Sequence, residues 1–313
     1  MRKEGLKILI LLLILCALFP WTILRWYQED TASEDFSIRV LMPDGNVKTL
    51  GLEEYLIGVV AAEMPAEFAE EALKAQAIAA RTYAAKSISL QGELGNPYDV
   101  DTTVNTQVWI SEEQMKKKWN WFAYWRYHKK IGKAVADTKG QVLVANGEYI
   151  DAFFHSSTGR KPTERSEDVW SSSRPYLQNV PGGEENPYRF VKNYSFSPLE
   201  LAQKLGISLI SRDFGEEDFV ILSRTAAGRA KEIKVLGKNY SAAQLRTLLG
   251  LASTDMEVKI SPQEIQITTY GYGHAVGMSQ YGANDLAKAG MTCEEILQHY
   301  YPGTVILTLT KAK

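Results

Sequence analysis

Cysteine and histidine are scarce in this chain, which has two cysteines and four histidines among its 313 residues. Cys16 lies in an apolar run near the N-terminus and Cys293 stands alone in the rest, which therefore cannot form an intramolecular disulfide. The histidines and cysteines show no paired-ligand spacing of the kind that binds zinc. Stability must come from packing, and a catalytic metal would need ligands that are distant in the sequence.

The sequence also lacks an excess of charge of one sign and any repeated or low-complexity tract. Its 35 basic and 37 acidic residues give a formal net charge of -2, so the chain has no general attraction for nucleic acid or anionic lipid. This argues against a nucleic-acid partner. Hydrophobic residues make up 45% and charged residues 23%, which is typical of a folded protein with a substantial core.

The N-terminus carries one long apolar run. Residues 8–24 contain no charge and are long enough to span a bilayer core. Arg2, Lys3 and Lys7 precede the run, so the positive-inside rule predicts a cytoplasmic N-terminus. A cleaved signal peptide is the other interpretation, but no small-x-small cleavage site follows the run. We therefore predict a cytoplasmic tip and transmembrane anchor at residues 1–27, a polar linker at 28–35, and an extracytoplasmic domain at 36–313.

Two helices are predicted near the start of this domain. Residues 52–64 have apolar side chains at helical spacing, and Pro65 ends the helix, which places Glu63 in its last turn. Residues 70–89 form the second helix and include seven alanines between positions 72 and 85. Such small side chains let other elements approach the helix backbone closely, so we expect this helix at the centre of the fold.

The remaining signals mix strands and helices without a regular alternation. Turn sequences predict two β-hairpins, and the second is formed by residues 141–145 and 148–155 around Asn146-Gly147. Capping residues predict two further helices. The other predicted elements are the hairpin at residues 38–41 and 47–50, strands at 219–222 and 232–236, and helices at 241–249 and 292–300. This order predicts an α+β fold with helices and antiparallel hairpins.

Glu63 is the leading candidate for chemistry because its immediate neighbours, from Val59 to Pro65, are apolar. Burial raises the pKa of a carboxyl group, and a protonated carboxylic acid can donate its proton to a leaving oxygen, as the acid of a glycosidase does. The alternative is a helix-terminal glutamate that faces water or pairs with a base.

Two further polar groups stand in apolar or strand-like surroundings. Arg81 lies among small residues of the second helix, so it needs an anionic or polar partner: Glu63, a sugar carboxylate, or a structural salt bridge. His155 precedes Ser156 on a predicted strand, where adjacent side chains point to opposite faces. We therefore expect a binding or orienting role for this pair and no nucleophilic serine.

A glycine-rich segment at residues 270–282 contains His274 and Gln280. It has neither the spacing nor the lysine of a phosphate-binding loop, so a nucleotide is excluded. Its glycines permit tight turns that could bring these side chains to a groove, or could form a compact loop alone. A second unusual segment, residues 119–127, crowds aromatic side chains among lysines. It could bind sugars or anionic polymers, but an amphipathic helix with its aromatics packed inward would look the same, and this second interpretation is the one we expect.

Six segments in order along the domain resemble the stage II sporulation protein D family. The Glu-Met-Pro piece and the last segment are the most specific. The segments are Ala-Ala-Glu-Met-Pro at 61–65, Ala-Gln-Ala-Ile-Ala-Ala-Arg-Thr-Tyr at 75–83, Asn-Thr-Gln-Val-Trp at 105–109, Phe-His-Ser-Ser at 154–157, Arg-Pro-Tyr-Leu at 174–177, and Gly-His-Ala-Val-Gly-Met-Ser-Gln-Tyr-Gly-Ala at 273–283.

The resemblance implies a lytic transglycosylase of the cell membrane that degrades peptidoglycan when the forespore is engulfed. The implied substrates are glycan strands whose stem peptides an amidase partner, stage II sporulation protein P, has removed, and the implied third partner is stage II sporulation protein M. The catalytic glutamate of the family falls on Glu63. Arg81 and Tyr176 match positions in the family's groove. The other motif positions are Gln107, His155, Ser156, His274 and Gln280.

One departure concerns zinc. Some family members bind the metal with a Phe-His-Ser-x-Cys-Gly-Gly segment, whereas this chain has Thr158 and Arg160 at the positions of the cysteine and the second glycine. We therefore expect no cofactor. A lytic transglycosylase needs one acid, and the sequence shows no paired carboxylate beside Glu63. The alternatives that stay open are a wall-binding protein that enhances an amidase without cutting, and plain hydrolysis.

Overall fold

The computed structural model of the chain describes residues 36–170, 172–208 and 213–309, and most of them belong to one compact unit, Ile38–Thr310. Across these ranges no helix has the length and apolar character needed to cross a bilayer. The anchor and the linker predicted at residues 1–35 lie outside the described residues.

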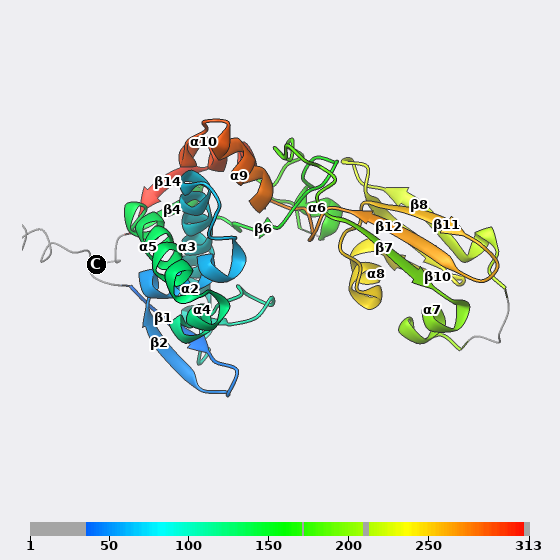
Figure 1. Cartoon of the computed structure of the whole chain (residues 1–313), viewed down its shortest axis with the longest axis horizontal. Coiled ribbons are helices and arrows are strands. Elements are labelled where there is room, and N and C mark those ends of the chain that lie inside the picture. Colours follow the sequence, from blue (N-terminus) through cyan, green and yellow to red (C-terminus); the bar gives the residue numbers. More distant parts are fainter. Residues whose placement is uncertain (1–35, 171, 209–212, 310–313) are drawn as a thin grey trace, which may run out of the picture. The chain divides into compact units, whose positions relative to one another are not determined.

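Three helices pack against one another in the first part of this unit: α2 (Leu52–Glu63), α3 (Glu70–Glu93) and α5 (Trp121–Asp137) (Figure 1). α3 is central, as its alanines predict, because it also contacts α9 (Gln280–Lys288) and α10 (Cys293–Tyr300). Both predicted helices are confirmed. α3 continues beyond the predicted end at residue 89.

Two small sheets and a short helix accompany these helices. One sheet has the strand order β2-β1-β3, with β1 parallel to β3, and the other has the antiparallel order β14-β4-β5. The bounds are β1 (Ser37–Leu41), β2 (Val47–Gly51), β3 (Val100–Asp101), α4 (Glu112–Lys118), β4 (Gln141–Ala145), β5 (Glu148–Tyr149) and β14 (Val305–Thr308). The two predicted hairpins are thus present.

The strand predicted over residues 148–155 is wrong in its middle. β5 ends at Tyr149, and the chain then turns, with the Phe153 N–H bonded to the carbonyl of Asp151 at 2.8 Å. The chain resumes as β6 (Phe154–His155), which pairs in parallel with β13 (Met278–Ser279). Pairing with a segment more than a hundred residues away overrides the local strand pattern.

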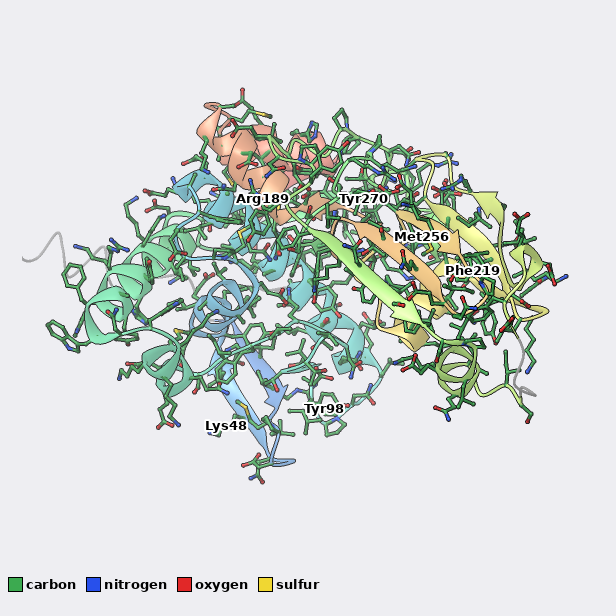
Figure 2. The ribbon with its side chains drawn as sticks, turned by 45° about the vertical axis from the view of Figure 1, so that its right-hand side comes forward. Lys48, Tyr98, Arg189, Phe219, Met256 and Tyr270 are labelled. Carbon is green, nitrogen blue, oxygen red and sulfur yellow. The ribbon has the colours of Figure 1, made fainter. Side chains whose placement is uncertain are left out.

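The second part of the unit consists of two antiparallel three-stranded sheets, β11-β12-β7 and β10-β9-β8, with α7 and α8 (Figure 1). Phe219 and Met256, labelled in Figure 2, belong to the shared core of these elements. The bounds are α6 (Ser166–Val169), β7 (Val191–Phe196), α7 (Pro198–Lys204), η1 (Glu216–Asp218), β8 (Phe219–Arg224), β9 (Ala230–Val235), β10 (Lys238–Ser241), α8 (Ala242–Leu249), β11 (Met256–Ile260) and β12 (Ile265–Tyr270). The mixture of helices and mainly antiparallel sheets confirms the α+β prediction.

Capping residues fix the helix ends where the sequence predicts them. The Ser241 hydroxyl accepts the Gln244 N–H at 3.1 Å, and Gly250 ends α8 with a φ of 69°. Thr292 caps α10 in the same way, with Glu295 completing the capping box.

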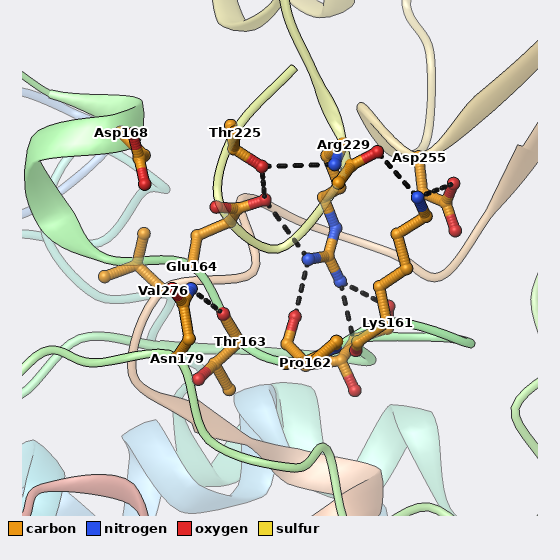
Figure 3. A network of polar contacts seen from close by, with 12 residues as sticks. Lys161, Pro162, Thr163, Glu164, Asp168, Asn179, Thr225, Arg229, Asp255 and Val276 are labelled. Atoms are coloured by element: carbon orange, nitrogen blue, oxygen red, sulfur yellow. Dashed lines mark hydrogen bonds and ion pairs between the residues drawn. The ribbon is translucent and has the colours of Figure 1, made fainter.

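A buried polar network joins the loop after β6 to the turn between β8 and β9 (Figure 3). Arg229 is 0% exposed and donates to the carbonyls of Thr158 and Pro162 at 2.7 and 2.5 Å. Its guanidinium lies 3.2 Å from Glu164 Oε1, which accepts the Thr225 hydroxyl at 2.8 Å. Both charged groups are removed from water, so each buried charge is stabilised by the charge of the other.

Candidate active site

Glu63 is the last residue of α2, and the buried residues Val59, Val60 and Ala61 precede it. Its Oε1 accepts the Val108 N–H at 2.9 Å. Burial raises the pKa of the Glu63 carboxyl, and the hydrogen bonds from Val108 and from the Gln280 side chain oppose this rise. The arrangement favours a carboxylic acid that keeps its proton to a higher pH than an ordinary glutamate.

The segment that carries Val108 packs directly on α2 at Gly58. A Cβ atom at Gly58 would collide with the indole of Trp109 and lie 2.8 Å from the carbonyl oxygen of Ile110. The Ile110 N–H lies 3.4 Å from the Gly58 carbonyl oxygen. The missing side chain at Gly58 therefore lets this segment bring a backbone donor to the Glu63 carboxylate.

Two pockets share Glu63 in their linings. The first pocket has a volume of about 420 Å³ and is lined mainly by aromatic and polar side chains. The second pocket has a volume of about 370 Å³ and a similar character. The first includes Glu63, Glu67, Lys118, Trp119, Ser156, Phe190, Tyr272, Gln280 and Tyr281, and the second includes Glu63, Tyr83, Asn105, Gln107, Phe153, Trp170 and His274. The acid therefore has space for a bound molecule on two sides.

Four of the residues expected from the sequence line these pockets beside Glu63. Ser156 and Gln280 belong to the first pocket, and Gln107 and His274 belong to the second. Gln107 is buried, and its amide accepts the hydroxyl of Tyr55 and donates to the carbonyl of Ala80. The glycine-rich segment thus contributes to both pockets, with Tyr272, Gln280 and Tyr281 in the first and His274 in the second.

His155 and His274 lie close together, and both imidazoles are neutral near pH 7. His155 lines neither pocket: its Nδ1 is 3.1 Å from the Val276 carbonyl, and burial holds its pKa well below the usual range. The His274 Nδ1 accepts the Val276 N–H at 3.1 Å, and burial with the nearby Arg246 charge lowers the pKa of His274 to about 4. Neutral imidazoles supply hydrogen bonds and flat surfaces to this site, but no positive charge.

Arg81 lies outside both pockets, in contrast to the substrate-binding role predicted from the sequence. Its guanidinium is 0% exposed and holds both carboxylate oxygens of Glu53 at 2.9 and 2.6 Å. It also donates to the carbonyls of Val135 and Gln141. All of its donors face protein acceptors, so the structural salt bridge is the interpretation that fits.

Tyr176 also lies apart from Glu63. It lines a separate cavity of about 610 Å³ that includes Lys86 and Arg174. Its hydroxyl accepts the Asp151 N–H at 3.0 Å, and both basic side chains bind the Asp151 carboxylate. This network holds Tyr176 at the turn that follows β5, in a cavity separate from the two pockets that Glu63 lines.

The segment aligned with the zinc motif of some relatives uses its side chains for internal contacts. The Thr158 N–H and hydroxyl donate to Glu184 Oε1 at 2.6 and 2.9 Å, and the Ser279 hydroxyl donates to the same oxygen at 2.9 Å. Arg160 pairs with Asp255. Residues 36–170, 172–208 and 213–309 contain no group of three or more His, Cys, Asp or Glu that could hold a metal ion. These residues do not fit a zinc site.

Several pocket residues were missed from the sequence. Glu67 is a second carboxylate in the first pocket, where a hydrogen bond from the Tyr127 hydroxyl lowers its pKa. Phe190 comes from a segment that carried no functional signal of its own, whereas Tyr272 lies in the glycine-rich segment but was not itself singled out. Trp119 belongs to the aromatic segment. This segment has more aromatic residues than one buried helix face can hold, which was the available indication that some of them line a surface.

That aromatic segment forms the end of α4 and the start of α5. Tyr124 and Tyr127 are buried, as expected for an amphipathic helix. Trp121, Phe122 and Trp125 are 76%, 70% and 60% exposed, so the expectation of inward packing is wrong for these three.

Comparisons with known proteins agree with the resemblance. The family model SpoIID, stage II sporulation protein, matches residues 44–144. The chain is 41% identical to stage II sporulation protein D of Bacillus subtilis (strain 168) over 266 residues, which is 83% of this chain and 76% of the relative. It is also 41% identical to the protein of that name from Bacillus amyloliquefaciens over 267 residues, 83% and 75% of the two chains. An amidase enhancer of Bacillus subtilis (strain 168) is 32% identical over 303 residues, 80% of this chain and 40% of the relative. The chain belongs to the stage II sporulation protein D family.

Proposed function

We propose that this protein is a peptidoglycan lytic transglycosylase that cleaves the bond between N-acetylmuramic acid and N-acetylglucosamine in peptide-free glycan strands. One observation carries the proposal: Glu63, a partly buried carboxyl with a raised pKa, lines two pockets of similar size. An acid that cuts a polymer needs space for a sugar on each side of the bond. Aromatic side chains in both pockets suit the apolar faces of sugar rings.

In the proposed reaction Glu63 first acts as general acid. It gives its proton to the glycosidic oxygen, and the bond from that oxygen to muramyl C1 breaks as positive charge develops on the ring. The Glu63 carboxylate then accepts the proton of the muramyl 6-hydroxyl, and O6 forms a bond to C1. One proton leaves the carboxyl and one returns, so the glutamate is regenerated and the product carries a 1,6-anhydro ring.

The backbone and side-chain donors around Glu63 suit this double role. The Val108 N–H and the Gln280 side chain stabilise the carboxylate that exists between the two proton transfers. Burial favours the protonated form that starts the reaction. Each of the two protonation states is thus favoured by part of the surroundings, as suits a single group that acts first as general acid and then as general base.

Glu67 bears on the alternative of plain hydrolysis, because a hydrolase uses a second carboxylate to activate water or to attack C1. The Tyr127 hydroxyl donates to Glu67, and Arg126 and Lys130 also act on its charge. Glu67 is thus occupied by other groups, whereas Glu63 has the raised pKa of an acid. Water does not enter the proposed reaction, and the products of the two reactions differ in mass by one water.

The biological setting is part of the same proposal. Relatives named stage II sporulation protein D and amidase enhancer support a role in sporulation beside a cell-wall amidase. We propose that a membrane anchor at residues 8–24 holds the domain outside the cell membrane at the septum. Its proposed partners are the amidase stage II sporulation protein P and the membrane protein stage II sporulation protein M. We propose that the reaction needs no metal cofactor.

Mass spectrometry of digested strands tests the activity. Purified peptide-free glycan strands are incubated with the unmodified protein, with Glu63→Gln, and with Glu54→Gln as a control that removes an exposed carboxylate from the same helix. We expect 1,6-anhydro ends from the first and the third, and none from Glu63→Gln despite an unchanged fold. Reducing muramic ends would show hydrolysis instead. Intact strands that still bind the protein would support a scaffold that enhances the amidase.

A further inference from the structure

Lys118 stands beside the candidate acid without an ionic partner. It is the last residue of α4, and the helix end places it with Trp119 in the lining of the first pocket. Its Nζ donates to the carbonyl of Ala61 at 2.9 Å, two residues before Glu63. Lys118 is thus held to the same helix that carries the acid.

No carboxylate in the described ranges lies within salt-bridge distance of Lys118. Lys117 and Lys129 share this feature, but Lys118 lines the first pocket together with Glu63. Lys116 pairs with Glu112 at 2.7 Å, and Lys133 on α5 pairs with Glu70 and Asp137. Partial burial lowers the pKa of the Lys118 ammonium, and Glu67 opposes this from a greater distance. An ammonium has three N–H donors, and one of them is used by Ala61. A bound anion would supply both the missing charge and the missing acceptors.

The chemistry of the wall polymer indicates which anion this is. Each muramic acid carries a lactyl ether on its ring, and the lactyl carbonyl is an amide as long as the stem peptide is attached. An amidase that removes the peptide leaves a lactyl carboxylate on the same sugar. Of the two sugars that flank the scissile bond, the muramyl residue alone gains a negative charge in this way, and that charge is absent from strands that keep their peptides.

We infer that Lys118 binds the lactyl carboxylate of peptide-free muramic acid in the first pocket. This inference rests on the proposed function and adds to it a specificity-determining residue. It assigns the muramyl sugar to the first pocket and the N-acetylglucosamine leaving group to the second. A charge-assisted hydrogen bond between ammonium and carboxylate is stronger than one to a neutral amide, so prior action of an amidase creates the preferred substrate.

The test compares two forms of the same peptide-free strands: one with free lactyl carboxylates, and one in which they have been converted to methylamides. The full-length protein is purified in a mild detergent as the unmodified chain and as Lys118→Met, Lys118→Arg and Lys117→Met. Lys117 lies next to Lys118 on α4, is exposed and lines neither pocket, so its variant matches the loss of charge. The readout is kcat/KM for the release of 1,6-anhydro ends.

We expect the unmodified protein to prefer the carboxylate strands by at least about ten-fold, which corresponds to about 1.4 kcal/mol. Lys118→Met should lose this preference and cleave both strands as slowly as the unmodified protein cleaves the methylamide strands. Lys118→Arg should keep most of the preference, and Lys117→Met all of it. Equal cleavage of both strands by the unmodified protein would overturn the inference, and so would a Lys118→Met variant that is slowed equally on both.

A binding arm separates this inference from the proposed function. Dissociation constants of both strands are measured by calorimetry for Glu63→Gln, alone and combined with Lys118→Met. If the unmodified protein releases no anhydro ends, the proposed reaction fails, and binding then decides the role of Lys118. A preference for carboxylate strands that disappears with Lys118→Met supports the subsite, whereas equal affinities for both strands, or a preference that survives the substitution, refute it.

Discussion

Replacement of Arg229 by methionine tests whether the buried network of Figure 3 stabilises the loop that lines the first pocket. Arg229 and Glu164 are both fully buried, with side-chain exposures of 0% and 1%. Burial lowers the pKa of Arg229 and raises that of Glu164, so each ion is stabilised mainly by its partner. Arg229→Met would remove the donor to the carbonyls of Thr158 and Pro162 and leave the Glu164 carboxylate with the Thr225 hydroxyl but without its ionic partner.

Removing one partner of a buried ion pair typically costs about 3–5 kcal/mol, and we expect Arg229→Met to lower the free energy of unfolding by this amount. Glu164→Gln keeps the shape and one acceptor, so its cost should be smaller, about 1–3 kcal/mol. The double variant should cost less than the sum of the single variants, because neither charge is then left alone.

The assay is urea unfolding at 25 °C, with the free energy obtained by linear extrapolation for the four proteins of the cycle. Lys116→Met, which removes an exposed lysine that pairs with the exposed Glu112, serves as the control and should change stability by less than about 1 kcal/mol. An Arg229→Met protein as stable as the unmodified chain, or costs that simply add in the double variant, would refute the reasoning.

Three further predictions concern the site itself. Gly58→Ala should lower kcat/KM for anhydro-product release by about ten-fold or more, because the new methyl displaces Trp109 and with it the backbone donor to Glu63; full activity would show that the donor is dispensable. Gln280→Met removes a hydrogen bond that lowers the Glu63 pKa. Since the acid must be protonated, the alkaline limb of the pH–rate profile should move to higher pH, and an unmoved limb in a folded variant contradicts this. Dialysis against a chelator should leave both activity and melting temperature unchanged; loss of either, restored by zinc, would reveal a metal that the sequence and the site do not predict.

Local signals explain what the sequence predicted well. The ends of α2, α8 and α10 are set by residues within one turn, such as Pro65, Ser241 and Thr292, so they can be identified without a fold. The apolar neighbours of Glu63 likewise indicated its burial. The helix ends and the apolar surroundings of Glu63 each depend on a few adjacent residues, and the structure shows both as the sequence predicts.

The features that the sequence did not predict depend on contacts between residues that are far apart in the chain. The partner of Arg81 is Glu53 on another helix, and the wall of the first pocket includes Phe190 and Tyr272, which are far from Glu63 along the chain. The strand predicted up to His155 breaks because β6 pairs with β13. A single sequence gives motif positions without the distances between them, so it could not show that Arg81 and Tyr176 lie outside the two pockets that Glu63 lines.

The position of Glu63 between two pockets has a mechanical consequence for a wall under turgor. A glycan-cleaving enzyme that binds sugars on both sides of its catalytic acid can act on an interior bond and does not have to start from the end of a strand. One interior cleavage releases the tension in a whole glycan strand at once, whereas removal of sugars from one end leaves the rest of the strand under tension. Under the proposed function, we therefore expect a small number of these molecules to soften a septum long before much soluble sugar is released.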